Sequence, residues 1–129
     1  MTIEGRCLCG GLVFRASGPP KWVAHCHCSL CRRAHGAPYV TWVGYPEDAV
    51  EIVQDGTLAT YRSSAEGRRR FCARCGSQVF FDGTRWPGEV HVARALLPDD
   101  APIPEPQVHA YWDSRAPWVH VEDTLPKRP

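Results

Sequence analysis

Three cysteines lie within six positions of this sequence, at Cys26, Cys28 and Cys31. Alternate side chains of an extended segment share a face, so Cys26 and Cys28 point the same way, and a turn after Cys28 brings Cys31 to them. Three converging thiolates bind zinc and leave one of its four tetrahedral positions open, as in zinc sites that do chemistry. The alternative is that two of these cysteines help to build a structural site and the third is a buried thiol.

A second metal-binding signal is the zinc knuckle of Cys72 and Cys75, followed by Gly76, which suits a left-handed turn. This pair needs two more ligands, either Cys7 and Cys9 or two of the three central cysteines, and spacing leaves both pairings open. Pairing with Cys7 and Cys9 leaves a compact trio instead of a stray thiol. Joining Cys9 to Cys72 closes a loop of more than sixty residues, at a cost of about 3–4 kcal/mol. A structural zinc contributes roughly 10–16 kcal/mol and offsets that cost.

The trio of Cys26, Cys28 and Cys31 closes only loops of one and two residues, so it ties no distant segments together. A zinc site with three thiolates has a less negative net charge than one with four, so its zinc ion is the better Lewis acid. We therefore expect the trio to serve function and not folding. Disulfides are the alternative, but the cysteine count of seven is odd and the C-x-C and C-x-x-C spacings favour metal.

Histidines and arginines flank the trio. In an extended chain His25 and His27 point away from the metal, and we expect His27 to lie behind the site or at the surface. His25, or His35 if a helix turns back, is the candidate for a fourth ligand. Arg32 or Arg33 could hold a carboxylate, and the alternative is a solvated helix face.

Charge and hydropathy exclude several function classes. The chain has 129 residues and a formal net charge of +1, so no field for nucleic acid or membranes is implied. The arginine run 68–70 is the one candidate for a phosphate-binding patch. In a strand Arg69 faces the opposite way from its two neighbours, so the cluster of positive charge is narrower than the run suggests. No apolar run reaches the ~20 residues of a membrane span, and the first residues lack signal-peptide features. We expect one cytoplasmic domain, residues 1–129, without a membrane or nucleic-acid partner.

Twelve prolines and eleven glycines favour short strands and turns. Strands are predicted within 6–15 around a Gly-Gly turn and at 22–26, 39–43, 51–54, 58–63, 68–72, 78–81, 89–95, 108–112 and 118–121. A hairpin of 68–72 and 78–81 carries the zinc knuckle at its tip. We expect a short helix over 29–35 capped by Ser29, a helical turn at 46–49, and a frayed tail after Leu125.

Four segments carry a resemblance to a known family: CLCGGLVF at 7–14, HCHCSLCRRAHGAP at 25–38, FCARCGS at 71–77 and HAYWDSRAPW at 109–118. Together they resemble the glutathione-dependent formaldehyde-activating enzyme family, which also contains centromere protein V. All seven cysteines fall on family positions in the same order. The likeness runs over nearly the whole chain.

This resemblance implies a mainly β protein with a β-tent fold of antiparallel sheets and short helical turns, stapled by a four-cysteine zinc site. It also implies a structural zinc bound by Cys7, Cys9, Cys72 and Cys75, and a catalytic zinc bound by Cys26, Cys28 and Cys31. Two zinc ions per chain are then expected, with the three-cysteine site able to stand partly empty.

The family's namesake reaction joins glutathione to formaldehyde and is grouped with carbon–sulfur lyases. The resemblance therefore implies a zinc-dependent lyase that acts on a thiol adduct, with a small thiol such as glutathione as its partner. One alternative is a non-enzymatic zinc-binding module for protein or nucleic acid, which should carry a basic extension that this chain lacks. Another is a redox or metal-buffering protein. The true substrate, the fourth zinc ligand, the retention of that zinc when a thiol binds and the oligomeric state stay open.

Overall fold

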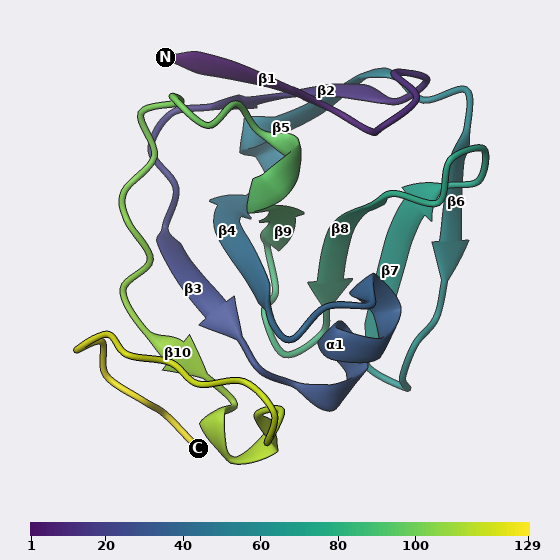
Figure 1. Cartoon of the computed structure of the whole chain (residues 1–129). Helices are drawn as coiled ribbons and strands as arrows, with labels where there is room; N and C mark the ends of the chain where they lie inside the picture. Colours follow the sequence, from purple (N-terminus) through teal and green to yellow (C-terminus); the bar gives the residue numbers. More distant parts are fainter.

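The computed structural model describes residues 1–129, and strands dominate it (Figure 1). A small antiparallel sheet at one end of the molecule has the order β1-β2-β5. Its strands are β1 (Thr2–Arg6), β2 (Val13–Ser17) and β5 (Val50–Gln54). In β1 and β2 the buried side chains of Ile3, Phe14 and Ala16 alternate with exposed ones, as expected where one face of a sheet is solvated.

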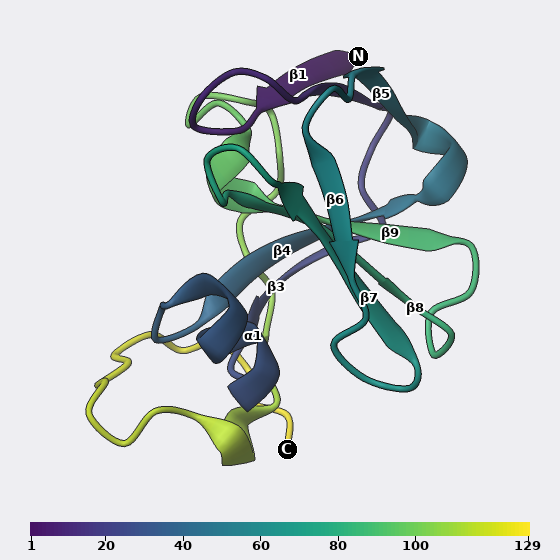
Figure 2. The same cartoon turned by 90° about the vertical axis from the view of Figure 1, so that its right-hand side faces the viewer.

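A larger sheet, with the order β10-β3-β4-β9-β8-β7-β6, forms the rest of the body. Its strands are β3 (Trp22–Cys26), β4 (Val40–Pro46), β6 (Leu58–Tyr61), β7 (Gly67–Cys72), β8 (Gln78–Gly83), β9 (Glu89–Ala93) and β10 (His109–Ala110). Figure 2 shows the small sheet lying across one end of the large sheet. The expected mainly β architecture is confirmed, with one addition: β10 pairs in parallel with β3.

Helical structure is limited to α1 (Ser29–His35) and the 3-10 turns η1 (Glu47–Ala49), η2 (Arg94–Leu96) and η3 (Trp112–Ser114). Cys28 is the N-cap of α1 and makes no side-chain capping bond, so the predicted Ser29 cap is wrong. The helix ends at His35, and the left-handed backbone of its C-cap, Gly36 (φ 59°), suits glycine. None of the helices has the length and hydropathy needed to cross a bilayer.

The main hydrophobic core joins the two sheets. Phe14 of the small sheet meets Phe80 of the large one edge to face, with ring centroids 5.0 Å apart. Burying each such side chain contributes about 1.5–3 kcal/mol, and Cys7 and Cys72 belong to this core. A second, smaller cluster contains Cys26, Cys31, Val40, Trp42 and Ala93.

The end of the chain differs from expectation. Residues 118–121 form no strand, and the tail is not frayed. The backbone N–H of His109 donates to the carbonyl of Pro126, and the N–H of Arg128 donates to the carbonyl of His109, both at 2.9 Å. These bonds lay the tail along β10 (Figure 1). A proline lacks the N–H but keeps the carbonyl, so Pro126 still serves as an acceptor here.

Candidate metal centre and active site

The turn after β1 and the hairpin tip of β7 and β8 bring four cysteines together. The sulfurs of Cys7, Cys9, Cys72 and Cys75 all lie within 4.8 Å of one another. Cys9 Sγ is 3.6 Å from Cys7 Sγ and 3.7 Å from Cys72 Sγ. Four thiolates placed tetrahedrally at about 2.3 Å from zinc have sulfurs about 3.8 Å apart, so donors and spacing fit that metal. All seven cysteines are free thiols.

Hydrogen-bond donors surround this four-cysteine group. The backbone N–H of Cys75 donates to Cys72 Sγ at 3.4 Å, and the Thr57 hydroxyl lies 3.0 Å from the same sulfur. The Ser77 hydroxyl lies 3.2 Å from Cys75 Sγ and lowers the pKa of Cys75 to about 5. Donors of this kind favour thiolates, the form that binds metal.

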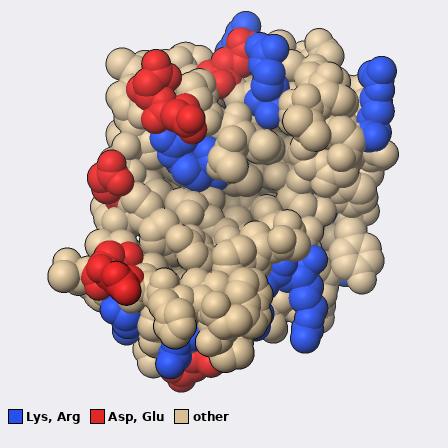
Figure 3. All heavy atoms as spheres, in the orientation of Figure 1, with Lys and Arg blue, Asp and Glu red and all other residues tan.

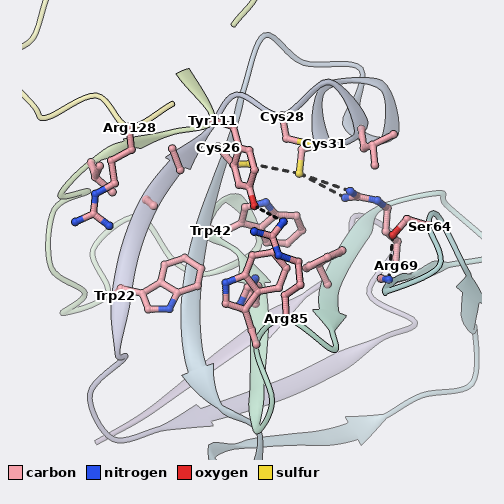
Figure 4. Close-up of a pocket in the computed structure, with 18 of the residues that line it drawn as sticks. Trp22, Cys26, Cys28, Cys31, Trp42, Ser64, Arg69, Arg85, Tyr111 and Arg128 are labelled. Carbon is pink, nitrogen blue, oxygen red and sulfur yellow. Dashed lines mark hydrogen bonds between the residues drawn. The ribbon is translucent and has the colours of Figure 1, made fainter. Parts of the chain in front are cut away.

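The other three cysteines lie where β3 gives way to α1. Cys26 ends β3, Cys28 caps α1 and Cys31 lies in its first turn, and all three line one cavity (Figure 4). Cys26 Sγ and Cys31 Sγ are 3.5 Å apart, but the three sulfurs are less tightly gathered than the group of four. Hydrogen bonds among the side chains lower the pKa of Cys28 and raise the pKa of Cys26. The cysteines thus divide into a group of four and a group of three.

The cavity beside the trio has a volume of about 510 Å³, within the usual range of small-molecule sites. Twelve of its 22 lining residues are hydrophobic. The aromatic lining residues are Trp22, Trp42, Phe81, Trp86 and Tyr111. On the face drawn in Figure 3 the charged side chains stand apart, around a largely uncharged centre. The aromatic walls of the cavity exclude water and strengthen the few polar contacts inside it.

Arg69 is the buried cation of this cavity. The residue is 4% exposed, whereas Arg68 beside it is exposed, as strand alternation predicted. Its Nη1 and Nη2 lie 3.7 and 3.6 Å from Cys31 Sγ, and its Nε donates to the Ser63 hydroxyl at 3.1 Å. The guanidinium carbon also lies 4.9 Å from the centre of the Phe81 ring. Strand alternation predicted that Arg69 faces away from Arg68 and Arg70. The site that it faces is seen only in the structure, where β7 lies next to α1.

Tyr111 is the one non-glycine residue with a positive φ, 56°. Structures tend to keep such backbone strain on bulky residues at functional sites. Its ring packs against the cluster that contains Cys26, and Arg85 Nη1 donates to its hydroxyl at 3.2 Å. Burial raises the pKa of Tyr111, so the phenol stays protonated at neutral pH. Because Arg85 uses a lone pair of the oxygen, the phenol proton remains available to a ligand.

The histidines of β3 and β10 lie behind the trio. His27 points away from it, as expected, but is fully buried and not at the surface. Its Nε2 is 2.8 Å from His109 Nδ1, and His109 Nε2 is 2.9 Å from Asp123 Oδ2. His25 Nδ1 lies 2.8 Å from the Thr41 hydroxyl. These rings bond to one another and to their neighbours, so they brace β3 from behind.

The candidate residues of α1, Arg32, Arg33 and His35, do not line the cavity. His35 turns its ring edge-on to Trp42, with centroids 5.2 Å apart. Arg32 Nη2 donates to the carbonyl of Ser114 at 3.0 Å, and neither Arg32 nor Arg33 lines the cavity. The arginine beside the trio is therefore Arg69 of β7, and not Arg32 or Arg33 of α1.

Several known proteins are similar to this chain. Residues 2–114 match the family described as glutathione-dependent formaldehyde-activating enzyme. A Halomonas elongata protein described as "Putative glutathione-dependent formaldehyde-activating enzyme" is 34% identical over 131 residues, covering 95% of this chain and 82% of that protein. An uncharacterized lyase of Schizosaccharomyces pombe is 28% identical over 78 residues, covering 60% of this chain and 56% of that protein.

The crystal structure of a Rhodobacter sphaeroides protein shares the fold. Its TM-score is 0.65 at 23% sequence identity, over 78% of this chain and 92% of that one. The extent of the family match and the identity to the Halomonas protein decide the classification. The chain belongs to the glutathione-dependent formaldehyde-activating enzyme family.

Proposed function

We propose that this chain catalyses the addition of a small thiol to an aldehyde and the reverse cleavage of the carbon–sulfur bond, with glutathione and formaldehyde as the reference pair. Family membership supports this reaction class. The observation that carries the proposal is the placement of Cys26, Cys28 and Cys31 on the wall of a cavity that also holds the Arg69 guanidinium. In the forward direction the sulfur–carbon bond forms, the carbonyl π bond opens, and the thiol proton is replaced by one on the carbonyl oxygen.

The two cysteine groups take different parts in this proposal. We assign a structural zinc to Cys7, Cys9, Cys72 and Cys75, and a second zinc to Cys26, Cys28 and Cys31. The sulfur spacing in the first group and the buried cation beside the second support these assignments. A zinc ion held by the trio would supply Lewis acidity and favour the thiolate form of a substrate.

Two side chains of the cavity have roles that follow from their contacts. Arg69 lies against Cys31 Sγ and offsets the negative charge of the trio. The Tyr111 hydroxyl, held by Arg85, donates a hydrogen bond to the aldehyde oxygen as negative charge develops there. The apolar walls keep water from competing for this oxygen. The protein thereby orients the thiol and the aldehyde next to each other.

The test is an exchange measurement by NMR with ¹³C-labelled formaldehyde, glutathione and zinc-loaded protein. We expect adduct formation to accelerate in proportion to protein concentration, and Cys28→Ser to abolish the acceleration. Tyr111→Phe should lower it by about 10- to 100-fold, as expected when one donor to a developing oxyanion is lost. Tyr61→Phe, at an exposed tyrosine outside this cavity, is the matched control. A wild-type protein that leaves the exchange rate at the buffer value would refute the proposal.

A further inference from the structure

The cavity has two ends of different chemical character, one on each side of the trio. Figure 4 shows Arg69 and Ser64 on one side, and Trp22 on the other with Arg128 above it at the rim. At the first end the Ser63 hydroxyl accepts a hydrogen bond from Arg69 Nε at 3.1 Å. This end therefore offers a cation and hydroxyls to a polar ligand. We refer to these ends as the polar end and the aromatic end.

Trp22 is fixed as a flat wall of the aromatic end. Its Nε1 donates to Glu89 Oε1 at 3.2 Å. Gly44 stands opposite Trp22 in the β3–β4 register, and a Cβ at that position would overlap the indole ring. The glycine therefore lets the ring lie close over the backbone of β4. A ring held by a hydrogen bond at its edge and by packing over Gly44 is ready for a ligand before the ligand arrives.

Further aromatic rings continue this wall. His91 meets Trp22 edge to face, with ring centroids 4.5 Å apart, and Trp86 lies 5.3 Å from His91. Phe81 follows at 5.7 Å from Trp86, again edge to face, and leads to the polar end, where the Arg69 guanidinium lies over its ring. Trp86 comes from the turn between β8 and β9, whereas the other rings lie within β3, β8 and β9, so the wall is assembled from three strands and one turn. Edge-to-face contacts favour a mutually fixed arrangement of the rings.

The reference substrates have nothing that matches this wall. Glutathione is built from glutamate, cysteine and glycine, so its groups are polar and suit the polar end. Formaldehyde has a single carbon and covers almost no apolar surface. The aromatic end therefore lacks a partner in that pair, although aromatic surface of this kind contributes strongly to binding when a ligand covers it.

We propose that the preferred aldehyde of this enzyme carries an aromatic ring on its carbonyl carbon, and that this ring packs against Trp22 and Trp86. The inference rests on the proposed function, because it takes the reacting carbon to lie beside the trio. The thiol half of the adduct then extends toward Arg69. The bond changes stay the same: sulfur bonds to the carbonyl carbon, the π bond opens and the oxygen gains a proton.

Two stable thioethers test this inference by calorimetric titration of the zinc-loaded protein. S-benzylglutathione and S-methylglutathione differ only in the phenyl ring that the aromatic end would receive. We expect the benzyl compound to bind about 10- to 100-fold more tightly. Trp86→Ala should remove most of this difference. Trp118→Ala, at a tryptophan that is 66% exposed and outside the cavity, should leave it unchanged.

The outcomes separate this inference from the proposed function. Equal affinities for the two thioethers overturn the aromatic preference and leave the glutathione–formaldehyde reaction standing. If Trp86→Ala does not fold, the wild-type catalytic rates with benzaldehyde and formaldehyde decide, and a lower kcat/KM for benzaldehyde overturns the inference. Binding of neither thioether, without acceleration of formaldehyde exchange, overturns the proposed function and this inference with it.

Discussion

Arg69 has its guanidinium beside Cys31, and none of the ion pairs in the chain includes it. Removing an unpaired cation from water costs several kcal/mol, so a buried arginine calls for a negative neighbour. Thiolates of the trio are the negative groups that its contacts provide. The same contact works in both directions, since the cation stabilises the thiolate form of the trio.

Neutralising this arginine should weaken the second metal site. We expect Arg69→Gln to lower the zinc affinity of the trio by about 10- to 100-fold, the usual cost of losing a side chain that supports metal ligands. Competition with a chromophoric chelator measures this affinity, and zinc bound per chain shows whether a second, tighter site stays filled. Arg68→Gln is the control, because Arg68 is exposed and pairs with Asp82 at 2.6 Å. Wild-type affinity in both variants would contradict the role of Arg69.

His35 makes the stability of the fold depend on pH. Its Nε2 is buried without a hydrogen-bond partner, and burial, together with the Arg69 charge, lowers the pKa of His35 from 6.5 to about 4. The unfolded chain binds this proton below about pH 6.5, so stability that is fully present above pH 6.5 falls as the pH drops toward 4.

A His35→Gln variant isolates this effect. Between pH 7 and pH 5 the variant should lose less free energy of unfolding than the wild type, by on the order of 1 kcal/mol for a partly exposed ring. Urea denaturation of both proteins at the two pH values gives the comparison. Identical losses in the two proteins would show that His35 takes no part in the pH dependence.

Among the elements, the short strand β10 connects the end of the chain to the site. It pairs with β3, whose last residue is Cys26, and the tail pairs with β10 in turn. The N–H of Trp112 donates to the carbonyl of Arg128 at 2.8 Å, and Pro126 and Arg128 line the cavity. The tail thus covers one edge of the large sheet and helps to enclose the site.

Deletion of residues 126–129 tests the contribution of the tail. Three backbone hydrogen bonds are lost and β10 becomes an open edge, so we expect a stability loss of about 2 kcal/mol. The thermal midpoint followed by circular dichroism reports the loss. Removal of Pro129 alone leaves these bonds in place and should have no effect. A deletion variant as stable as the wild type would mean that the tail contacts contribute nothing.

For the whole molecule, the two cysteine groups occupy different mechanical positions. The group of four joins the turn after β1 to the β7–β8 hairpin, which are far apart in the chain. The trio joins only neighbouring residues at the end of β3 and the start of α1. Zinc in the first group would therefore restrict the unfolded chain much more than zinc in the second.

Matched cysteine variants should separate these two roles. We expect Cys72→Ser to destabilise the chain by several kcal/mol, because a structural zinc contributes folding energy directly. Cys28→Ser should keep the thermal midpoint close to that of the wild type and lose only the second zinc. Zinc content per chain and thermal unfolding measure both effects. If the two variants unfold at the same lowered temperature, the division into a structural and a functional group is wrong.

Most of the strands and the helix could be predicted, because their patterns are local. The helix over 29–35 and the hairpin that carries Cys72 and Cys75 were found where the sequence placed them. The ordered tail was missed, because its hydrogen bonds depend on a partner strand more than fifteen residues earlier. The Ser29 cap was wrong because the position of a cap depends on the residue at which the backbone becomes helical. In this chain Ser29 is already helical, and Cys28 is the N-cap.

The order of residues was enough to identify the chemical types: seven thiols in motifs with metal-binding spacing, in a chain of nearly balanced charge. It did so because ligand spacing and side-chain alternation act over a few residues. It is the folded chain that brings Arg69 against Cys31, Tyr111 against Arg85, and Trp22 and Trp86 into one wall. Those contacts join residues from separate strands, and their positions follow from sheet order and packing.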